Sequence, residues 1–342
     1  MKSSISPWNF CRVLVLTSLV VAGLRGAGAD PAFLGRWALT LPNGRAGWLE
    51  VKKENGWFDG SLLWGGGSVL PVASLTVTDG QLTVTRLVDV PRKDATGQVV
   101  RTHQLTDTIT GRMDGDTLKL TLVSPRADGS GFDRADFSGR RTPPLPPRPN
   151  LAKVKFGAPI ALFNGRDLSG WKLVEPNAEN GWSFSAGALN NRPAPAVAGQ
   201  PPRHFGNLRT EREFEDFNLT LEVNMPATGN SGVYLRGIYE VQIIDSYGKP
   251  LDSHNMGALY SRITPTVSAE KPAGEWQTLD ITLVDRHATV ILNGQKIIDN
   301  QPLLGCTGGA LWSDESRPGP IYLQGDHQDV SYRNLVLRPV VK

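Results

Sequence analysis

The sequence predicts an all-β protein with two domains joined by a proline-rich linker. Three observations lead to this fold class. Short segments alternate between apolar and polar residues, turn residues separate these segments, and the second half of the chain shows almost no helical periodicity. Alternation with a period of two is typical of strands that bury one face, whereas helices repeat every 3.6 residues. A chain of 342 residues is long enough to stabilise such a fold by core burial.

Residues 1–29 predict a secretory signal peptide that is cleaved before Asp30. A basic start with Lys2 precedes an apolar run from Val13 to Leu24 and the small residues 27–29. The apolar run is too short to cross the hydrocarbon core of a bilayer, and no later segment is apolar for long enough. We therefore expect a secreted or periplasmic protein that is not embedded in a membrane.

The charge of the chain limits its possible partners, and its cysteine content limits the ways in which the fold can be stabilised. The chain has 36 basic and 33 acidic residues, and three of the basic residues lie in the predicted signal peptide, so the mature chain is nearly neutral. Neutrality provides no electrostatic argument for nucleic acid or anionic lipid as partner. Cys11 would leave with the signal peptide, and Cys306 alone cannot form an internal disulfide.

Residues 30–138 predict a small antiparallel β-barrel or sandwich whose role the sequence does not indicate. Hairpin turns are expected at Asn55-Gly56 and Asp114-Gly115, because these dipeptides favour the positive φ angles of tight hairpins. Residues 139–155 contain five prolines interleaved with arginines, a composition that favours extended geometry and indicates a domain linker.

Residues 156–342 predict a second β domain with two packed antiparallel sheets. Asn293-Gly294 is a strong signal for a hairpin turn. Alternating segments lie at 217–223, 232–236, 239–244, 278–284 and 288–292. Because the linker separates two sets of strands that would each bury a core, we expect residues 156–342 to fold and act on their own.

Four segments of this second domain together resemble a bacterial family described as 3-keto-disaccharide hydrolase or 3-keto-glucoside 1,2-lyase and hydratase. The segments are 160–171 (IALFNGRDLSGW), 229–237 (GNSGVYLRG), 239–245 (YEVQIID) and 319–327 (GPIYLQGDH). The resemblance covers residues 156–340. It implies a concanavalin-like jelly-roll β-sandwich that acts on 3-keto-glycosides, and it implies nothing about residues 30–150.

The strand predicted at 239–245 carries two polar side chains on one face. Alternation places Glu240 and Gln242 together, about 7 Å apart along the strand. Such a pair indicates either the lining of a cleft or an ordinary solvated face. The segment is also similar to the catalytic strand of laminarinase and lichenase-type glucanases, which carries a Glu-x-Asp-x-x-Glu pattern. Gln242 and Asp245 depart from that pattern, so the similarity implies only a site on the concave face of the larger sheet.

Cleavage of a 3-keto sugar requires particular chemical groups in the site. The ketone acidifies the C2 proton, so cleavage by elimination needs a base, an acid near the leaving oxygen, and a positive group for the enolate. Glu240 is the candidate base, and Asp326 and His327 are candidates for proton relay or metal binding. Arg236 is the candidate for the enolate. The candidate substrate-binding residues are Asn230, Arg236, Gln242, Asp245, His254, Tyr260 and Gln324.

The sequence shows no pattern that identifies a cofactor site. The mature chain has one cysteine and no His-x-x-x-His, so no zinc pattern exists. A divalent cation such as calcium stays open, since carboxylate and carbonyl oxygens could bind it, but no spacing identifies a site. The chain has no Gly-x-Gly-x-x-Gly after a strand, so a separate dehydrogenase would oxidise the sugar.

The expected partner is a small oligosaccharide or glycoside. Two other functions stay open: a non-catalytic, lectin-like glycan-binding module, because this sandwich also builds lectins, and a glucanase-like glycoside hydrolase.

Overall fold

The computed structural model describes residues 31–194 and 203–341, so the predicted signal peptide with Cys11 lies outside the described residues. The described chain consists of β-strands and two short 3-10 helices, Pro31–Phe33 and Leu151–Lys153. All strands belong to three antiparallel sheets, which confirms the predicted all-β class. No helix in these residues has the length and apolarity that a membrane span requires.

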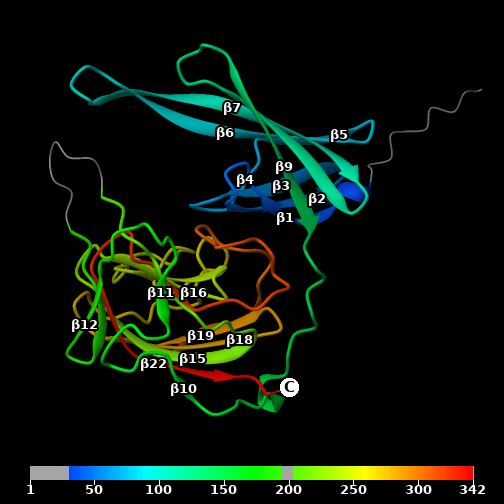
Figure 1. The fold of residues 1–342 in the computed structure, drawn as a ribbon. Coiled ribbons are helices and arrows are strands. Elements are labelled where there is room, and N and C mark those ends of the chain that lie inside the picture. Colours follow the sequence, from blue (N-terminus) through cyan, green and yellow to red (C-terminus); the bar gives the residue numbers. More distant parts are fainter. Residues whose placement is uncertain (1–30, 195–202, 342) are drawn as a thin grey trace, which may run out of the picture.

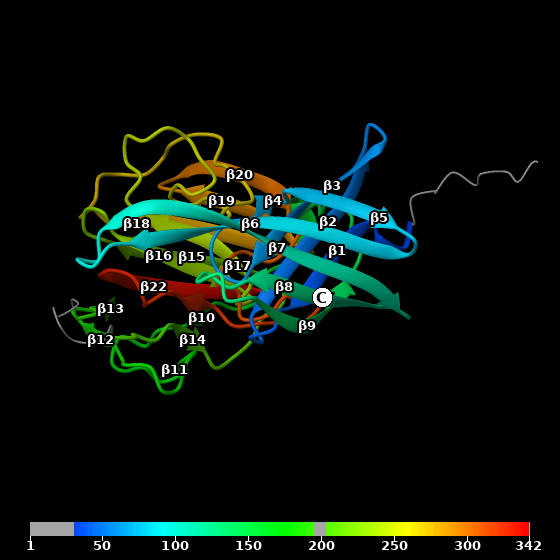
Figure 2. The same cartoon turned by 90° about the horizontal axis from the view of Figure 1, so that it is seen from above.

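The N-terminal sheet has nine strands in the order β4-β3-β2-β1-β9-β8-β7-β6-β5. Its core is built around the fully buried side chains of Trp37, Leu82 and Leu118. The β6–β7 hairpin is long and projects above the second domain (Figures 1 and 2). The strands are β1 (Gly35–Thr40), β2 (Ala46–Glu54), β3 (Trp57–Trp64), β4 (Leu70–Pro71), β5 (Ser74–Thr78), β6 (Gln81–Lys93), β7 (Val99–Asp114), β8 (Thr117–Pro125) and β9 (Phe132–Arg141).

The C-terminal domain is a sandwich of an eight-stranded and a five-stranded sheet. The larger sheet contains β10 (Ile160–Ala161), β12 (Trp182–Ser185), β13 (Ala188–Asn191), β15 (Phe217–Asn224), β18 (Gln277–Val284), β19 (His287–Leu292), β20 (Gln295–Pro302) and β22 (Val330–Pro339). The smaller sheet contains β11 (Trp171–Leu173), β14 (Leu208–Thr210), β16 (Asn230–Leu235), β17 (Tyr239–Ile244) and β21 (Tyr322–Leu323). Alternate residues of both sheets meet in one apolar core, as a face-to-face sandwich requires.

The core of the sandwich also includes residues of the N-terminal sheet. Trp48 of β2 and Leu63 of β3 are buried in the same cluster as the sandwich strands. The guanidinium of Arg262 stacks 4.1 Å from the Trp48 ring, and Gly305 packs so closely that a Cβ there would lie 2.3 Å from the indole nitrogen. The N-terminal sheet thus has a core of its own and also contributes residues to the core of the sandwich, so the boundary between the domains is itself an apolar contact.

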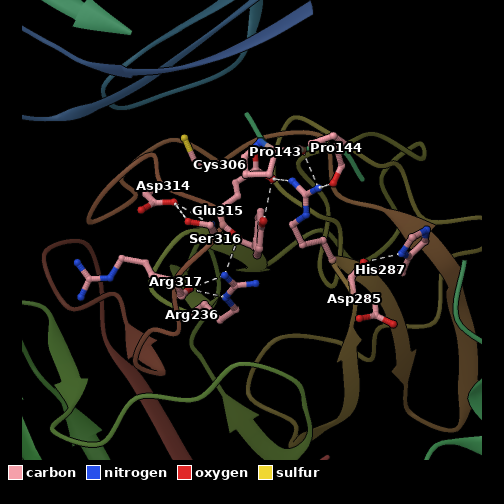
Figure 3. A network of polar contacts seen from close by, with 12 residues as sticks. Pro143, Pro144, Arg236, Asp285, His287, Cys306, Asp314, Glu315, Ser316 and Arg317 are labelled. Atoms are coloured by element: carbon pink, nitrogen blue, oxygen red, sulfur yellow. Dashed lines mark hydrogen bonds and ion pairs between the residues drawn. The ribbon is translucent and has the colours of Figure 1, made fainter. Parts of the chain in front are cut away.

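The proline-rich segment is also fixed to the sandwich. Arg286 donates to the carbonyl oxygens of Pro143, at 2.8 Å, and of Pro144, close to the buried carboxyl of Glu315 (Figure 3). Asn300 donates to the carbonyl oxygen of Pro149 at 2.9 Å. These bonds hold the segment along the sandwich.

Candidate active site

The site begins with two neighbouring strands of the five-stranded sheet. In the β16–β17 pair, Tyr234 faces Glu240 and Gly232 faces Gln242. Val241 packs in the core, so alternation turns the Glu240 and Gln242 side chains to the opposite face. Gly232 makes room for the carboxylate, because a Cβ at this position would lie 2.3 Å from Glu240 Oε1. The prediction that the site lies on the larger sheet is therefore wrong, because Glu240 and Gln242 belong to the smaller, five-stranded sheet. Sequence alternation does not reveal which strands pair.

A cavity of about 780 Å³ lies over this face. All three catalytic candidates line it, namely Glu240, Asp326 and His327. The substrate-binding candidates that line it are Asn230, Gln242, Tyr260 and Gln324. The two strands therefore form the wall of a cleft, and the structure brings together residues that are far apart in the sequence.

Glu240 is buried, with only 3% of its surface exposed. Burial is the main cause that raises the pKa of Glu240 to about 8; the Tyr234 hydrogen bond opposes this shift, and the nearby Asp326 charge adds to it. The Tyr234 hydroxyl lies 2.9 Å from Glu240 Oε2 and 2.8 Å from the carbonyl oxygen of Gly308. The hydroxyl has one proton for two acceptors, so the arrangement is satisfied when Glu240 is protonated and donates to Tyr234.

The amide of Gln242 lies next to the same carboxyl group. With its nitrogen toward Glu240, it is 3.2 Å from Oε1 and donates to the carbonyl oxygen of Ser231 at 3.0 Å. Its other amide atom is 3.3 Å from the Asn230 side chain. The Glu240 carboxyl group therefore has one polar neighbour on each oxygen, which fixes its orientation in the cavity wall.

Asp326 and His327 form a second polar group after β21. His327 Nδ1 lies 2.7 Å from Asp326 Oδ1, and this hydrogen bond raises the pKa of His327. For Asp326, burial acts to raise the pKa, but the hydrogen bond and charge of His327 outweigh it, so the pKa lies below its ordinary value. The His327 ring is partly exposed and can exchange protons with a molecule in the cavity.

Three of the substrate-binding candidates do not line the cavity, namely Arg236, Asp245 and His254. Arg236 donates to the carbonyl oxygens of Glu315, at 2.7 Å, and Arg317, at 3.1 Å, on the segment shown in Figure 3. Its backbone has a φ of 55° in the turn between β16 and β17, which directs the side chain away from Glu240. The expected enolate role of Arg236 does not fit this position. Asp245 accepts from the Thr228 backbone at 2.9 Å instead.

His254 connects the two domains. Its Nδ1 lies 2.5 Å from Asp252 Oδ1, and its Nε2 lies 2.8 Å from the hydroxyl of Ser68 in the N-terminal domain. Its ring meets Tyr260 edge to face, with the ring centroids 4.9 Å apart. His254 thus supports a residue that lines the cavity without lining it itself.

Sequence reasoning missed the residues that the N-terminal sheet brings to this cavity. Arg45 lines it from the β1–β2 turn, and Gly66 and Gly67 line it from the segment after β3. His204, from the sandwich domain, also lines it. No local pattern marks these positions, because their role depends on how the two domains meet.

Within residues 31–194 and 203–341, no group of three or more His, Cys, Asp or Glu side chains is arranged to hold a metal ion.

Comparison with known proteins matches the sandwich. The model of a family described as 3-keto-alpha-glucoside-1,2-lyase-like domain matches residues 158–338, more than half of the chain. Two structures from Parabacteroides distasonis, both provisionally described as glycosyl hydrolases, are similar. One is 28% identical over 58% of this chain and 94% of that chain, with a TM-score of 0.43. The other is 20% identical over 54% of this chain and 94% of that chain, with a TM-score of 0.42.

A carbohydrate-binding module from Bacillus subtilis is 11% identical over 49% of this chain and 95% of that chain, with a TM-score of 0.33. A search among curated proteins found no match.

Proposed function

The chain belongs to the 3-keto-alpha-glucoside-1,2-lyase-like family, and from this premise we propose that it cleaves 3-keto-glycosides by elimination and hydration. The observation that carries the proposal is the buried carboxyl group of Glu240. This group has a pKa of about 8 and lines a cavity that also contains the His327–Asp326 pair. Acid–base catalysis is most effective when the pKa of the catalytic group lies near the working pH.

Glu240 is the base in this reaction. Its ionised form takes the proton from C2, which the C3 ketone acidifies. The C2–H electron pair first forms the enolate of the C3 ketone and then becomes the C1=C2 bond as the bond from C1 to the leaving oxygen breaks. His327, whose pKa is raised by Asp326, gives its proton to that oxygen. Water then adds across C1=C2, so the sum of both steps is hydrolysis.

Amide side chains around Glu240 would bind the sugar. Gln324 Oε1 is buried and has no hydrogen-bond partner in the described part of the chain, so it is available to accept from a sugar hydroxyl. Asn230 and Gln242 line the same wall. Tyr260 adds an aromatic ring, against which the apolar face of a sugar packs well.

Product analysis in deuterated water tests the proposal. A synthetic 3-keto-glucoside should be cleaved, with deuterium at C2 of the product, and the unoxidised parent should remain intact. Equal rates on both sugars would instead indicate a glucanase-like glycoside hydrolase. Binding of both sugars without turnover would indicate a lectin-like module.

We also propose that the protein is exported to the periplasm or the medium, on the basis of residues 1–29. Mass spectrometry of the mature protein should find an N-terminus at Asp30. A cell-associated chain that still begins at Met1 would contradict export.

A further inference from the structure

The N-terminal sheet provides the second wall of the cavity. Asn43, Gly44 and Arg45 line it from the turn between β1 and β2, and Gly66 and Gly67 line it from the segment between β3 and β4. The opposite wall is formed by the strands that carry Glu240 and Gln242. A molecule that fills the cavity would therefore contact both domains.

Several direct contacts hold the 65–69 segment against the sandwich. The amide of Gly309 donates to the carbonyl oxygen of Gly65 at 3.1 Å, and the amide of Val69 donates to the hydroxyl of Ser261 at 3.0 Å. Gly67 lies so close to Gly308 that a Cβ on Gly308 would be 2.1 Å from the Gly67 carbonyl oxygen. Because two backbones meet here without intervening side chains, the position of this wall is well determined.

The turn that carries Arg45 is fixed at both ends. The amide of Leu41 donates to the carbonyl oxygen of Arg45 at 2.9 Å, and the amide of Arg45 donates to the side chain of Asn43 at 3.1 Å. Directly after Arg45, Ala46 and Trp48 enter the core of the sandwich. The backbone of Arg45 is therefore held at the cavity, while its long side chain remains exposed.

Charge distinguishes Arg45 from its neighbours. Among the described residues that line the cavity, it is the one arginine or lysine, whereas Glu175, Glu240 and Asp326 are acidic. Within the described ranges, no carboxylate forms an ion pair with Arg45. When the enolate forms, Glu240 has accepted the C2 proton and is neutral, but Glu175 and Asp326 would still repel the negative charge, so a nearby cation would stabilise the enolate. Arg236 cannot supply it, because it faces the 315–317 segment.

We propose that Arg45 binds the C3 oxygen of the 3-keto sugar and stabilises the enolate that forms on that oxygen. Its guanidinium donates hydrogen bonds and transfers no proton, since it stays charged throughout. This inference rests on the proposed function and makes the N-terminal domain a part of the catalytic site.

The test compares Arg45→Gln and Arg45→Lys with the control Arg134→Gln, an exposed arginine of β9 that does not line this cavity. We expect Arg45→Gln to lower kcat by roughly 10²-fold to 10³-fold, as loss of an oxyanion donor does. The factor should be the same for 3-keto-glucosides with two different leaving groups. Arg45→Lys should recover part of kcat, and the control should match the wild type. None of the variants should change Tm, because both arginine side chains are exposed.

Deuterium exchange at C2 separates the possible failures. If the wild type cleaves and exchanges, and Arg45→Gln does both equally well, Arg45 has no such role. An increase in KM alone, with a size that depends on the leaving group, would also overturn the inference and place Arg45 at the aglycone. If the wild type neither cleaves nor exchanges, the proposed function fails, and the inference fails with it.

Discussion

At the scale of single residues, Glu240 is the centre of the site. Replacement by glutamine keeps the shape of the side chain and removes its basicity. We expect Glu240→Gln to lower kcat by roughly 10²-fold to 10⁴-fold with little change in substrate affinity, the usual contribution of a positioned base. Glu275→Gln is a matched control, because Glu275 is exposed in the loop before β18. A wild-type rate in Glu240→Gln would remove Glu240 from the mechanism.

The raised pKa of Glu240 also predicts how the rate depends on pH. As a base, Glu240 must be ionised, so kcat/KM should rise with pH up to about 8, where the buried carboxyl group loses its proton. Loss of the His327 proton, which protonates the leaving oxygen, should lower the rate, and the hydrogen bond with Asp326 moves this loss to a higher pH than for an ordinary histidine. Glu240→Gln should abolish the rising limb in the activity that remains, and a rising limb in this variant would contradict the assignment.

Stability should depend on pH through the same residue. The pKa of Glu240 is raised from 4.5 to about 8 in the folded protein, so the folded state binds a proton that the unfolded state has already lost. This contribution is fully present below pH 4.5 and is lost as the pH rises through 8, at up to about 1.4 kcal/mol per pKa unit. Denaturant titrations should find a smaller decrease in stability between pH 5 and 8 for Glu240→Gln. Identical slopes for both proteins would contradict a neutral buried Glu240.

At the scale of elements, the position of the Glu240 carboxyl group in the β16–β17 pair depends on Gly232. A methyl group there would lie 2.3 Å from Glu240 Oε1, so Gly232→Ala should displace the carboxyl group. We expect a large loss of kcat and a destabilisation of about 1–3 kcal/mol, the usual cost of overpacking. Gly157→Ala is the control, since the nearest atom to its Cβ would be 3.4 Å away. Full activity in Gly232→Ala, measured with the 3-keto-glucoside, would show that Glu240 tolerates displacement.

At the scale of the whole molecule, the shared core makes the domains interdependent. Residues 156–342 alone would expose the apolar surface that Ala46, Trp48 and Leu63 cover in the full chain. Contrary to the expectation from the sequence, we expect this fragment to be less soluble, less stable and inactive. In the full chain, Trp48→Ala should cost about 3–5 kcal/mol, as for other buried tryptophans. A fragment with full activity and an unchanged Tm would show that the contact between the domains is dispensable.

Local features of the sequence determined much of the fold. Asn55 and Asn293 adopt positive φ angles of 50° in turns before glycine, as the two Asn-Gly signals predicted, because this geometry depends on neighbouring residues only. The alternation in 239–245 likewise placed Glu240 and Gln242 on one face, since side-chain direction in a strand is a local property. The segments that resemble the family correctly indicated the family to which residues 158–338 belong.

Only the tertiary structure decided the character of the site. The raised pKa of Glu240 follows from burial by residues distant in sequence, and the position of Arg236 follows from a turn that directs it to the 315–317 segment. Arg45 reaches the cavity because β2 packs Trp48 into the core of another domain. Burial, charge proximity and domain contact are properties of three-dimensional packing, and a one-dimensional pattern with a period of two carries no information about them.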